Sequence, residues 1–405
     1  MQRHLLLAAM LLAALFAGSA SAAPRLVGQK PAIPAVVGVG ADIVVAKDGS
    51  GGYSTVKDAI AAARSGTASR YFIIFIKAGV YNEQAVLPAS LRFIGLVGEN
   101  GTKITASNYS GQSNLNACAT FQLLASDMVV SNIIFENAHG PGVPGGQGDQ
   151  AVAVKAAGTR VAFYGCTFLG YQDTLYAVSG LQYYKNCVIQ GRVDFVFGNA
   201  KALFHNCQFN LVYWGGGYFA QSREKGDDTG YVILGGSLSP LGPGPIKPGY
   251  LARSWGKYST TIFVNTYFAA GSVRPEGWGY VAGNKKLRRV TFAVSGCYGP
   301  GYDTSQWDDT AEILTPSKAA PYSSIAYVNQ GGWITDPNVL VRGVGGKVND
   351  GGDGAIVPAG NATSSLPKPT SPPSSSLPKP SPPPPAPTSK DDKKSKKRDK
   401  KHKDD

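Results

Sequence analysis

Short runs rich in β-branched and aromatic residues follow one another through the middle of the chain, separated by Gly and Asn residues. Within each run apolar and polar residues alternate, which is typical of β-strands with one buried face. A clear helical pattern occurs at residues 54–64 (STVKDAIAAAR), where Ser54 or Thr55 can cap the first turn. The chain is therefore predicted to be all-β with a short N-terminal helix.

A unit of about twenty residues repeats within this region. The runs SNIIF (131–135), GCTF (165–168), NCVI (186–189) and NCQF (206–209) align in two apolar columns. One column holds Ile133, Cys166, Cys187 and Cys207, and the other holds Phe135, Phe168, Ile189 and Phe209. The last three runs are 21 and 20 residues apart, and a Gly-rich insertion (GPGVPGGQGD) lengthens the first gap. Like residues at constant spacing predict a right-handed, single-stranded parallel β-helix whose N-terminal end the helix covers. An antiparallel sandwich would explain the alternation but not the columns.

Two aspartates occupy equivalent places in consecutive units, because Asp173 and Asp194 each follow a column cysteine by seven residues. Stacked strands lie about 4.8 Å apart, so the two carboxyl groups would face each other. Like charges that close share a proton, and the pair then offers both an acid and a nucleophile. The alternative is that both are turn residues facing water.

Aromatic residues surround this pair, at Tyr171, Tyr176, Phe195 and Phe197. Flat rings suit the apolar faces of sugars, although some of these rings must belong to the core. The chain lacks the sequence motifs of other catalytic classes, because no G-x-S-x-G elbow, C-x-x-C pair, phosphate loop or dinucleotide fingerprint occurs. We therefore expect carboxylate chemistry with no metal and no cofactor.

The two ends of the chain differ from the middle. Residues 1–23 combine early basic residues, an apolar run and a small-residue end, which predicts a signal peptide followed by a linker at 24–41. An uncleaved membrane anchor is the alternative. Residues 346–389 form a Ser/Pro-rich linker, and residues 390–405 form a charged tail with nine Lys or Arg and five Asp.

The formal net charge is +13. The tail is too mixed in sign for a nucleic-acid arm, so an acidic polysaccharide outside the cell is the expected partner of the basic surface and tail. Five cysteines permit at most two disulfides, and Cys187 and Cys207 are either bonded or simply ladder residues. Sequons at Asn100, Asn108 and Asn361 are candidate glycosylation sites in a secreted chain.

An ordered series of motifs resembles the pectin methylesterases, especially the plant type. VVAKDGSGGYSTVKDAIAAA (44–63) is similar to the N-terminal strand and cap of that family. Its successive signatures resemble GVYNE (79–83), GDQAVAV (148–154), GYQDTLY (170–176), GRVDFVFGNA (191–200) and YLARSW (250–255). The resemblance covers residues 42–345 and implies a secreted, pectin-lyase-like β-helix. It also implies that the protein de-methylesterifies homogalacturonan in the cell wall and releases methanol.

The resemblance also implies roles for individual residues. Asp194 resembles the nucleophile, and Asp173 the general acid that later acts as a base. Gln150 and Gln172 resemble the oxyanion donors, and Arg253 the arginine that keeps Asp194 ionised. Trp255, Tyr176, Phe197 and Trp278 resemble substrate-binding aromatic residues. Without the resemblance, Gln150 could be a surface amide, Gln172 a ladder residue and Arg253 a surface cation.

The chain departs from the family pattern beside the arginine. Ala252 and Ser254 stand where the family usually has Gly and Pro, which leaves the substrate subsites in question but removes no catalytic group. No inhibitor-like pro-region is expected, since about twenty residues separate the leader from the fold. A pectin lyase or glycosidase and a non-catalytic, pectin-binding wall protein remain the alternatives. A monomer without a membrane span is expected.

Overall fold

The computed structural model describes residues 40–140, 149–212, 215–241, 247–280 and 289–334. The predicted signal peptide, the Ser/Pro-rich linker, the charged tail, the Asn361 sequon and nearly all of the linker at 24–41 lie outside these residues. No helix in the described ranges is long and apolar enough to cross a membrane.

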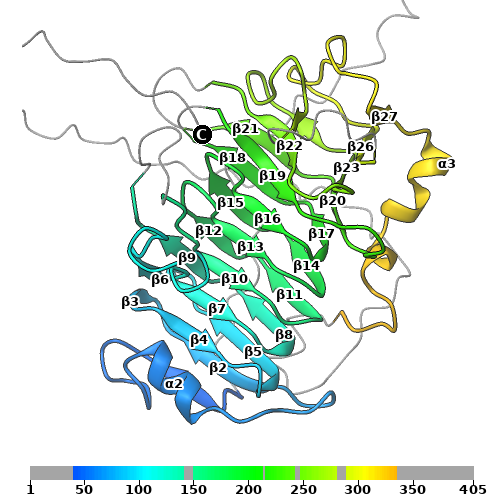
Figure 1. The fold of residues 1–405 in the computed structure, drawn as a ribbon. Coiled ribbons are helices and arrows are strands. Elements are labelled where there is room, and N and C mark those ends of the chain that lie inside the picture. Colours follow the sequence, from blue (N-terminus) through cyan, green and yellow to red (C-terminus); the bar gives the residue numbers. More distant parts are fainter. Residues whose placement is uncertain (1–39, 141–148, 213–214, 242–246, 281–288, 335–405) are drawn as a thin grey trace, which may run out of the picture. The chain divides into compact units, whose positions relative to one another are not determined.

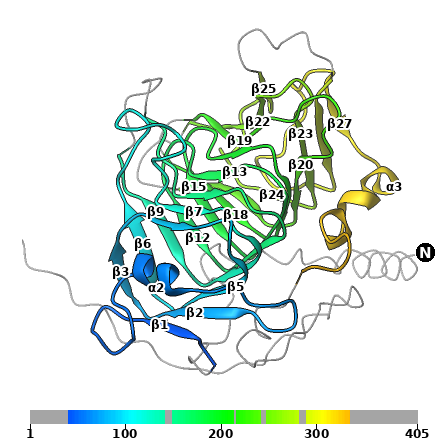
Figure 2. The same ribbon diagram turned by 60° about the horizontal axis from the view of Figure 1, so that its bottom comes forward.

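Most described strands belong to three parallel sheets, here called A, B and C (Figures 1 and 2). Sheet A contains, in spatial order, β1 (Ile43–Val45), β2 (Phe72–Ile76), β5 (Arg92–Gly98), β8 (Ser126–Ser131), β11 (Val161–Tyr164), β14 (Leu181–Lys185), β17 (Lys201–His205), β20 (Gly230–Leu234), β23 (Thr260–Val264), β26 (Thr291–Ser295) and β27 (Ala311–Ile313). Sheet B contains β3 (Gly79–Asn82), β6 (Thr102–Ala106), β9 (Ile134–Asn137), β12 (Thr167–Leu169), β15 (Val188–Gly191), β18 (Gln208–Leu211), β21 (Ser237–Pro240) and β24 (Tyr267–Phe268). Sheet C contains β4 (Ala85–Leu87), β7 (Phe121–Leu123), β10 (Val154–Ala156), β13 (Leu175–Ala177), β16 (Val196–Gly198), β19 (Gly217–Gln221), β22 (Tyr250–Ser254) and β25 (Gly279–Tyr280).

The chain visits sheets B, C and A in turn, so that each coil stacks on the coil before it. Neighbouring strands pair in parallel, as β9 with β12, β10 with β13 and β11 with β14 show. The predicted parallel β-helix is confirmed, and the antiparallel sandwich is wrong.

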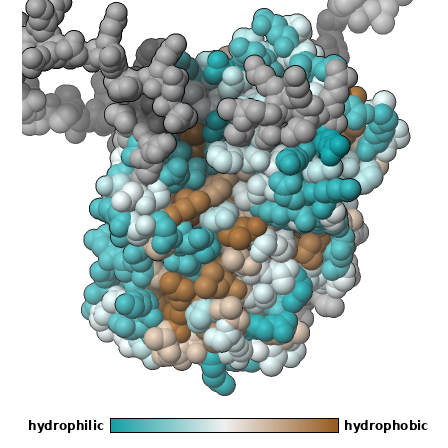
Figure 3. All heavy atoms as spheres, viewed as in Figure 1, coloured by the Kyte–Doolittle hydropathy of each residue, from teal (hydrophilic) through white to brown (hydrophobic). Residues whose placement is uncertain are grey.

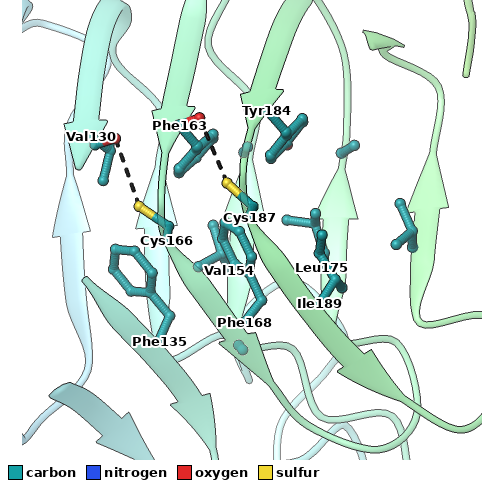
Figure 4. Packing of buried hydrophobic residues seen from close by; sticks show 14 of the residues in the cluster. Val130, Phe135, Val154, Phe163, Cys166, Phe168, Leu175, Tyr184, Cys187 and Ile189 are labelled. Atoms are coloured by element: carbon teal, nitrogen blue, oxygen red, sulfur yellow. Dashed lines mark hydrogen bonds between the residues drawn. The ribbon is translucent and has the colours of Figure 1, made fainter. Parts of the chain in front are cut away.

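The apolar columns predicted from the repeat form ladders inside the coils. In sheet B, Phe168 pairs in register with Phe135 on one side and with Ile189 on the other, and Ile189 pairs with Phe209. All four side chains are buried, and Figure 4 shows Phe135, Phe168 and Ile189 among them. Rings stack between coils as well, because Phe163 and Tyr184 lie 4.9 Å apart with nearly parallel planes. Burial of like residues on each other supplies the apolar core that holds successive coils together.

The cysteine column is a ladder of buried thiols. Cys166, Cys187 and Cys207 are all buried, and none of the five cysteines is in a disulfide. Each thiol donates instead to a carbonyl of the preceding coil, as Cys166 does to Val130 and Cys187 to Phe163, both at 3.6 Å (Figure 4). The structure thereby resolves the open question about Cys187 and Cys207 in favour of packing.

The predicted N-terminal helix is present but shorter than expected. Helix α2 spans Val56–Ala62, and the Thr55 hydroxyl accepts the N–H of Asp58 as its N-cap. The carboxylate of Glu83 accepts the first two helical amides, those of Val56 and Lys57, at 2.9 Å each. These bonds satisfy backbone N–H groups in the first turn, which have no acceptor within the helix. The helix packs on β1, β2 and β4 and covers the first coil.

The last described segment lies on the outer face of sheet A. It comprises α3 (Pro316–Ala319) and two 3₁₀ turns, η1 (Ala320–Tyr322) and η2 (Ile325–Tyr327). Val328 and Ile334 join an apolar cluster with Leu203, Val232 and Ile262, which point outward from sheet A. Sheet A is therefore buried on both faces, and its strands read as continuous apolar runs.

Candidate active site

Asp173 and Asp194 lie at the same corner of consecutive coils, between sheet B and sheet C. Gln172 and Val193 form a parallel bridge there, and the N–H of Asp173 donates to the carbonyl of Val193 at 3.1 Å. Both aspartates have a left-handed backbone, with φ of 64° and 47°. Few non-Gly residues adopt this conformation, and such residues concentrate at functional sites. The structure thus places the two aspartates in neighbouring coils, as the repeat predicts.

Two residues of a later coil bind the side chain of Asp194. Its side chain is buried, and it pairs with Arg253, whose Nε donates to Oδ1 at 2.7 Å while Nη2 donates to Oδ2. The indole Nε1 of Trp255 donates to the same Oδ2 at 2.9 Å. A carboxylate that accepts a bidentate guanidinium and a third donor is favoured in its charged form.

Asp173 has the opposite environment. It is only 9% exposed, and no hydrogen bond to its carboxyl group is found among the described residues. Burial raises the pKa of Asp173 well above its usual range, the charge of Asp194 raises it further, and Arg253 offsets part of the rise. The two members of the pair therefore differ: Asp194 contacts a guanidinium, whereas the raised pKa of Asp173 favours its protonated form.

Strand β22 brings Arg253 to this corner. Ala252 is buried and pairs with Phe219 of β19, while Arg253 lies opposite Gly279 of β25. Ser254 is also buried at the end of the strand. The two departures from the family pattern are thus accommodated in a regular strand, with Arg253 still on Asp194.

The two predicted oxyanion donors also lie in neighbouring coils. The N–H of Ala151 donates to the carbonyl of Gln172 at 3.1 Å, which sets Gln150 and Gln172 near each other. The Gln150 side-chain Oε1 accepts the hydroxyl of Ser110 at 2.5 Å, so that its amide nitrogen is the end left to donate. No partner of the Gln172 side chain is found in the described part of the chain. A role for Ser110 was not predicted from the sequence, in which this residue stood out only as the last position of the Asn108 sequon.

Three of the four predicted aromatic residues lie around the aspartates. Tyr176 and Phe197 pair in register on β13 and β16, and their partly exposed rings stack at 4.3 Å. Trp255 is 53% exposed beyond Asp194. Burial raises the pKa of Tyr176, and an ionised Asp173 would raise it further.

Trp278 does not belong to this group. Its side chain is only 3% exposed and stacks on Phe292 at 4.6 Å within the core. The predicted contact with substrate therefore has no support from its position, because the ring is already covered by neighbouring coils. Phe195 is likewise a core residue.

A separate recess of about 590 Å³ lies several coils nearer the N-terminus, lined by residues such as Lys57, Glu83 and Asn108. It does not contain the acid pair. The chemistry assembled in the molecule lies at the later coils, where an ionised carboxylate, a protonated carboxyl group and amide donors meet. Such a set can attack an acyl carbon and protonate a leaving group.

Comparisons with known proteins identify the family of the chain. Residues 42–331 match the family model described as Pectinesterase. Probable pectinesterase 67 of Arabidopsis thaliana is 30% identical over 341 residues, which cover 82% of this chain and 96% of that protein. Probable pectinesterase/pectinesterase inhibitor 6 of the same plant is 33% identical, and the match spans 55% of its length.

Solved structures are similar too. The pectin methylesterase from carrot has a TM-score of 0.68 and 31% identity, covering 73% of this chain and 95% of its own. A pectin methylesterase solved in complex with a hexasaccharide has a TM-score of 0.62 and 27% identity, covering 72% of this chain and 97% of its own.

Proposed function

This chain belongs to the pectinesterase family, and we propose that it hydrolyses the methyl esters of homogalacturonan with Asp194 as nucleophile and Asp173 as acid and base. The observation that supports this most is the unequal pair, in which Arg253 contacts Asp194 while Asp173 stays buried beside it. Carboxylate nucleophiles work through a covalent acyl intermediate.

In the first half of the reaction, a carboxylate oxygen of Asp194 attacks the carbonyl carbon of the methyl ester. The carbonyl oxygen of the ester becomes an oxyanion, which the side-chain amides of Gln150 and Gln172 stabilise by hydrogen bonds. Each such donor contributes about 3 kcal/mol in comparable sites. The C–O bond to the methoxy group then breaks, and Asp173 gives its proton to that oxygen, so that methanol leaves.

In the second half, Asp173 is a carboxylate and takes a proton from water. The resulting hydroxide attacks the acyl carbon of the mixed anhydride, and the bond to Asp194 breaks. Asp194 leaves as a carboxylate, Asp173 holds its proton again, and the galacturonic acid product ionises in solution. Each cycle consumes one water and one methyl ester and yields one acid and one methanol.

The aromatic residues around the pair suit a sugar chain. Tyr176, Phe197 and Trp255 present partly exposed rings on the side of the aspartates. Such rings pack on the apolar faces of pyranose units. The enzyme acts outside the cell on wall pectin, as the leader at 1–23 suggests, and its basic surface and tail bind acidic wall glycans, as the net charge of +13 suggests.

Methanol release from methyl-esterified pectin by the purified protein tests the function. We expect steady release that scales with enzyme and stops when the esters are consumed. A protein that binds pectin but releases no methanol would instead be a non-catalytic wall binder. Cleavage of the polymer backbone would identify a lyase or a glycosidase.

A further inference from the structure

The outward positions of sheet C form one row that passes the acid pair. In order of strand register the row consists of Val86, Gln122, Lys155, Tyr176, Phe197 and Ala220. Successive members lie one strand apart, about 4.8 Å, and so form a continuous strip along the coils. On the face shown in Figure 3, apolar surface gathers over these strands with hydrophilic surface on either side.

Lys155 is the cation of this strip. It is partly exposed and directly precedes Tyr176 in the register. No carboxylate or other hydrogen-bond partner of its ammonium group is found among the described residues. The half-buried Lys103 contacts Glu136 at 3.1 Å, and the buried Lys201 contacts Asp228 at 2.8 Å.

The charge of Lys155 is not used by the acid pair. Arg253 is the cation that lowers the pKa of Asp173. Arg253 itself is occupied by Asp194. The ammonium group of Lys155 therefore remains available to bind a ligand. It lies beside a stacked pair of rings, next to a site proposed to act on a polymer of uronic acids.

We infer that Lys155 binds the free carboxylate of a galacturonate unit that has already lost its methyl group, on the β10 side of the ester under attack. This inference rests on the proposed function. A methyl ester offers only a neutral carbonyl, whereas a carboxylate forms a charge-assisted hydrogen bond with an ammonium group. Lys155 therefore distinguishes chains that carry a free acid at this position from fully esterified chains.

The test compares Lys155→Gln with wild type on two oligogalacturonides, one fully methyl-esterified and one partly de-esterified. We expect KM for the partly de-esterified substrate to rise by about tenfold, the lower end for a hydrogen bond to a charged group. KM for the fully esterified substrate and kcat for both should change less than about twofold. Lys155→Arg should restore most of the preference, because it keeps the charge.

Lys185→Gln is the matched control, since Lys185 ends β14 in sheet A and its loss changes the net charge equally. Equal effects of Lys155→Gln on both substrates, or no effect, would overturn the inference. If the wild type releases no methanol, the proposed function fails. Calorimetric binding of de-esterified oligogalacturonate would then still decide the role of Lys155, because only Lys155→Gln should weaken it.

A different observation concerns Ser110. Its N–H donates to the carbonyl of Gln150 at 2.9 Å while its hydroxyl donates to the side-chain oxygen of the same residue. An amide side chain can present either end, and only the nitrogen end can donate to an oxyanion. We propose that Ser110 is a positioning residue that fixes the orientation of Gln150, which rests on the role proposed for that glutamine.

Ser110→Ala should lower kcat by about tenfold with little change in KM, because a loosened donor loses stabilisation only in the transition state. Ser110→Thr keeps a hydroxyl and should restore the rate. Because Ser110→Ala also destroys the sequon at Asn108, Asn108→Gln is the control and should behave as wild type. An unchanged kcat in Ser110→Ala, or an equal loss in Asn108→Gln, would refute the positioning role. A failure of the proposed function would appear instead as an inactive wild type.

Discussion

Two corners of the coil use the same backbone conformation for different purposes. At the corner from sheet A to sheet B, Asn186, Asn206 and Asn265 have φ of 54°, 52° and 52°. At the corner from sheet B to sheet C, Asp173 and Asp194 have φ of 64° and 47°. Asn and Asp tolerate this left-handed conformation because their short polar side chains bond locally.

The surroundings of the two corners differ. Asn206 and Asn265 are exposed, with the buried cysteine and threonine ladder beside them. Asp173 and Asp194 are nearly covered, and a guanidinium from sixty residues further along the chain contacts one of them. The backbone of a turn therefore does not determine its chemistry. Burial and one charged neighbour convert a turn residue into a reactive group.

The largest effect is expected from a substitution that gives the aspartate corner the residue type of the asparagine corner. Asp194→Asn places at this corner the residue that the other corner already uses, and its amide oxygen can still accept from Arg253 and Trp255. The fold should persist while kcat falls by about 10⁴-fold or more, because the nucleophile is lost. Methanol release and circular dichroism measure the two effects, and substantial residual activity would contradict the nucleophilic role.

Removing the charged neighbour should have the next largest effect. Arg253→Gln leaves the buried carboxylate of Asp194 without its cation, which costs about 3 kcal/mol of unfolding free energy. Urea unfolding with methanol release as a parallel measurement should show loss of both stability and rate. Arg274→Gln is a suitable control, because the contact of Arg274 with Glu276 is largely exposed. Equal stability of the two variants would show that the pairing contributes little.

The raised pKa of Asp173 predicts a pH-dependent stability. Above the ordinary aspartate pKa of 3.8, the unfolded chain releases a proton that the native state retains. The stabilisation that Asp173 contributes is therefore complete below that pKa and is lost as the pH rises through the higher, native pKa. Asp173→Asn has no such proton, so its unfolding free energy relative to wild type should increase from about pH 3.5 to about pH 7.5. A constant difference across this range would contradict the shifted pKa.

The smallest effect is expected at the structural corner. Asn206→Ala puts a residue without a polar side chain into the left-handed conformation, which costs about 1 kcal/mol. Thermal unfolding should show this loss, whereas kcat and KM should stay unchanged because the A-to-B corner carries no reacting group. Asn206→Gly relieves the conformation and should recover part of the stability. A change in kcat would mean that the two corners are coupled.

Much of the fold could be predicted from the repeat alone. The columns through Phe168 and Cys187 specify parallel coils, because only stacked coils bring like residues together at a spacing of about twenty. The same arithmetic placed Asp173 and Asp194 in neighbouring coils. The helix at α2 was predicted with a longer range, since the apolar pattern continues past the point where the helix ends at Ala62.

The remaining parts of the site depend on contacts that no local pattern encodes. Arg253 and Trp255 were identified by resemblance, and only the stacking of β22 beside β19 brings them onto Asp194. Trp278 was likewise assigned by resemblance, but Phe292 of a later strand covers its ring. Alternation along β10 could have indicated Lys155 as outward-facing, although its place beside Tyr176 required the register.

The sequence by itself determined the period, the buried ladders and the presence of two acids at equivalent positions, because these follow from the spacing of residues within a repeated unit. The tertiary structure decided which acid contacts the arginine and which has a raised pKa, that the cysteines form no disulfide, and which aromatic rings remain exposed. Those properties depend on burial and on neighbours contributed by distant coils, and the electrostatic interactions between such groups become strong only where the fold excludes water.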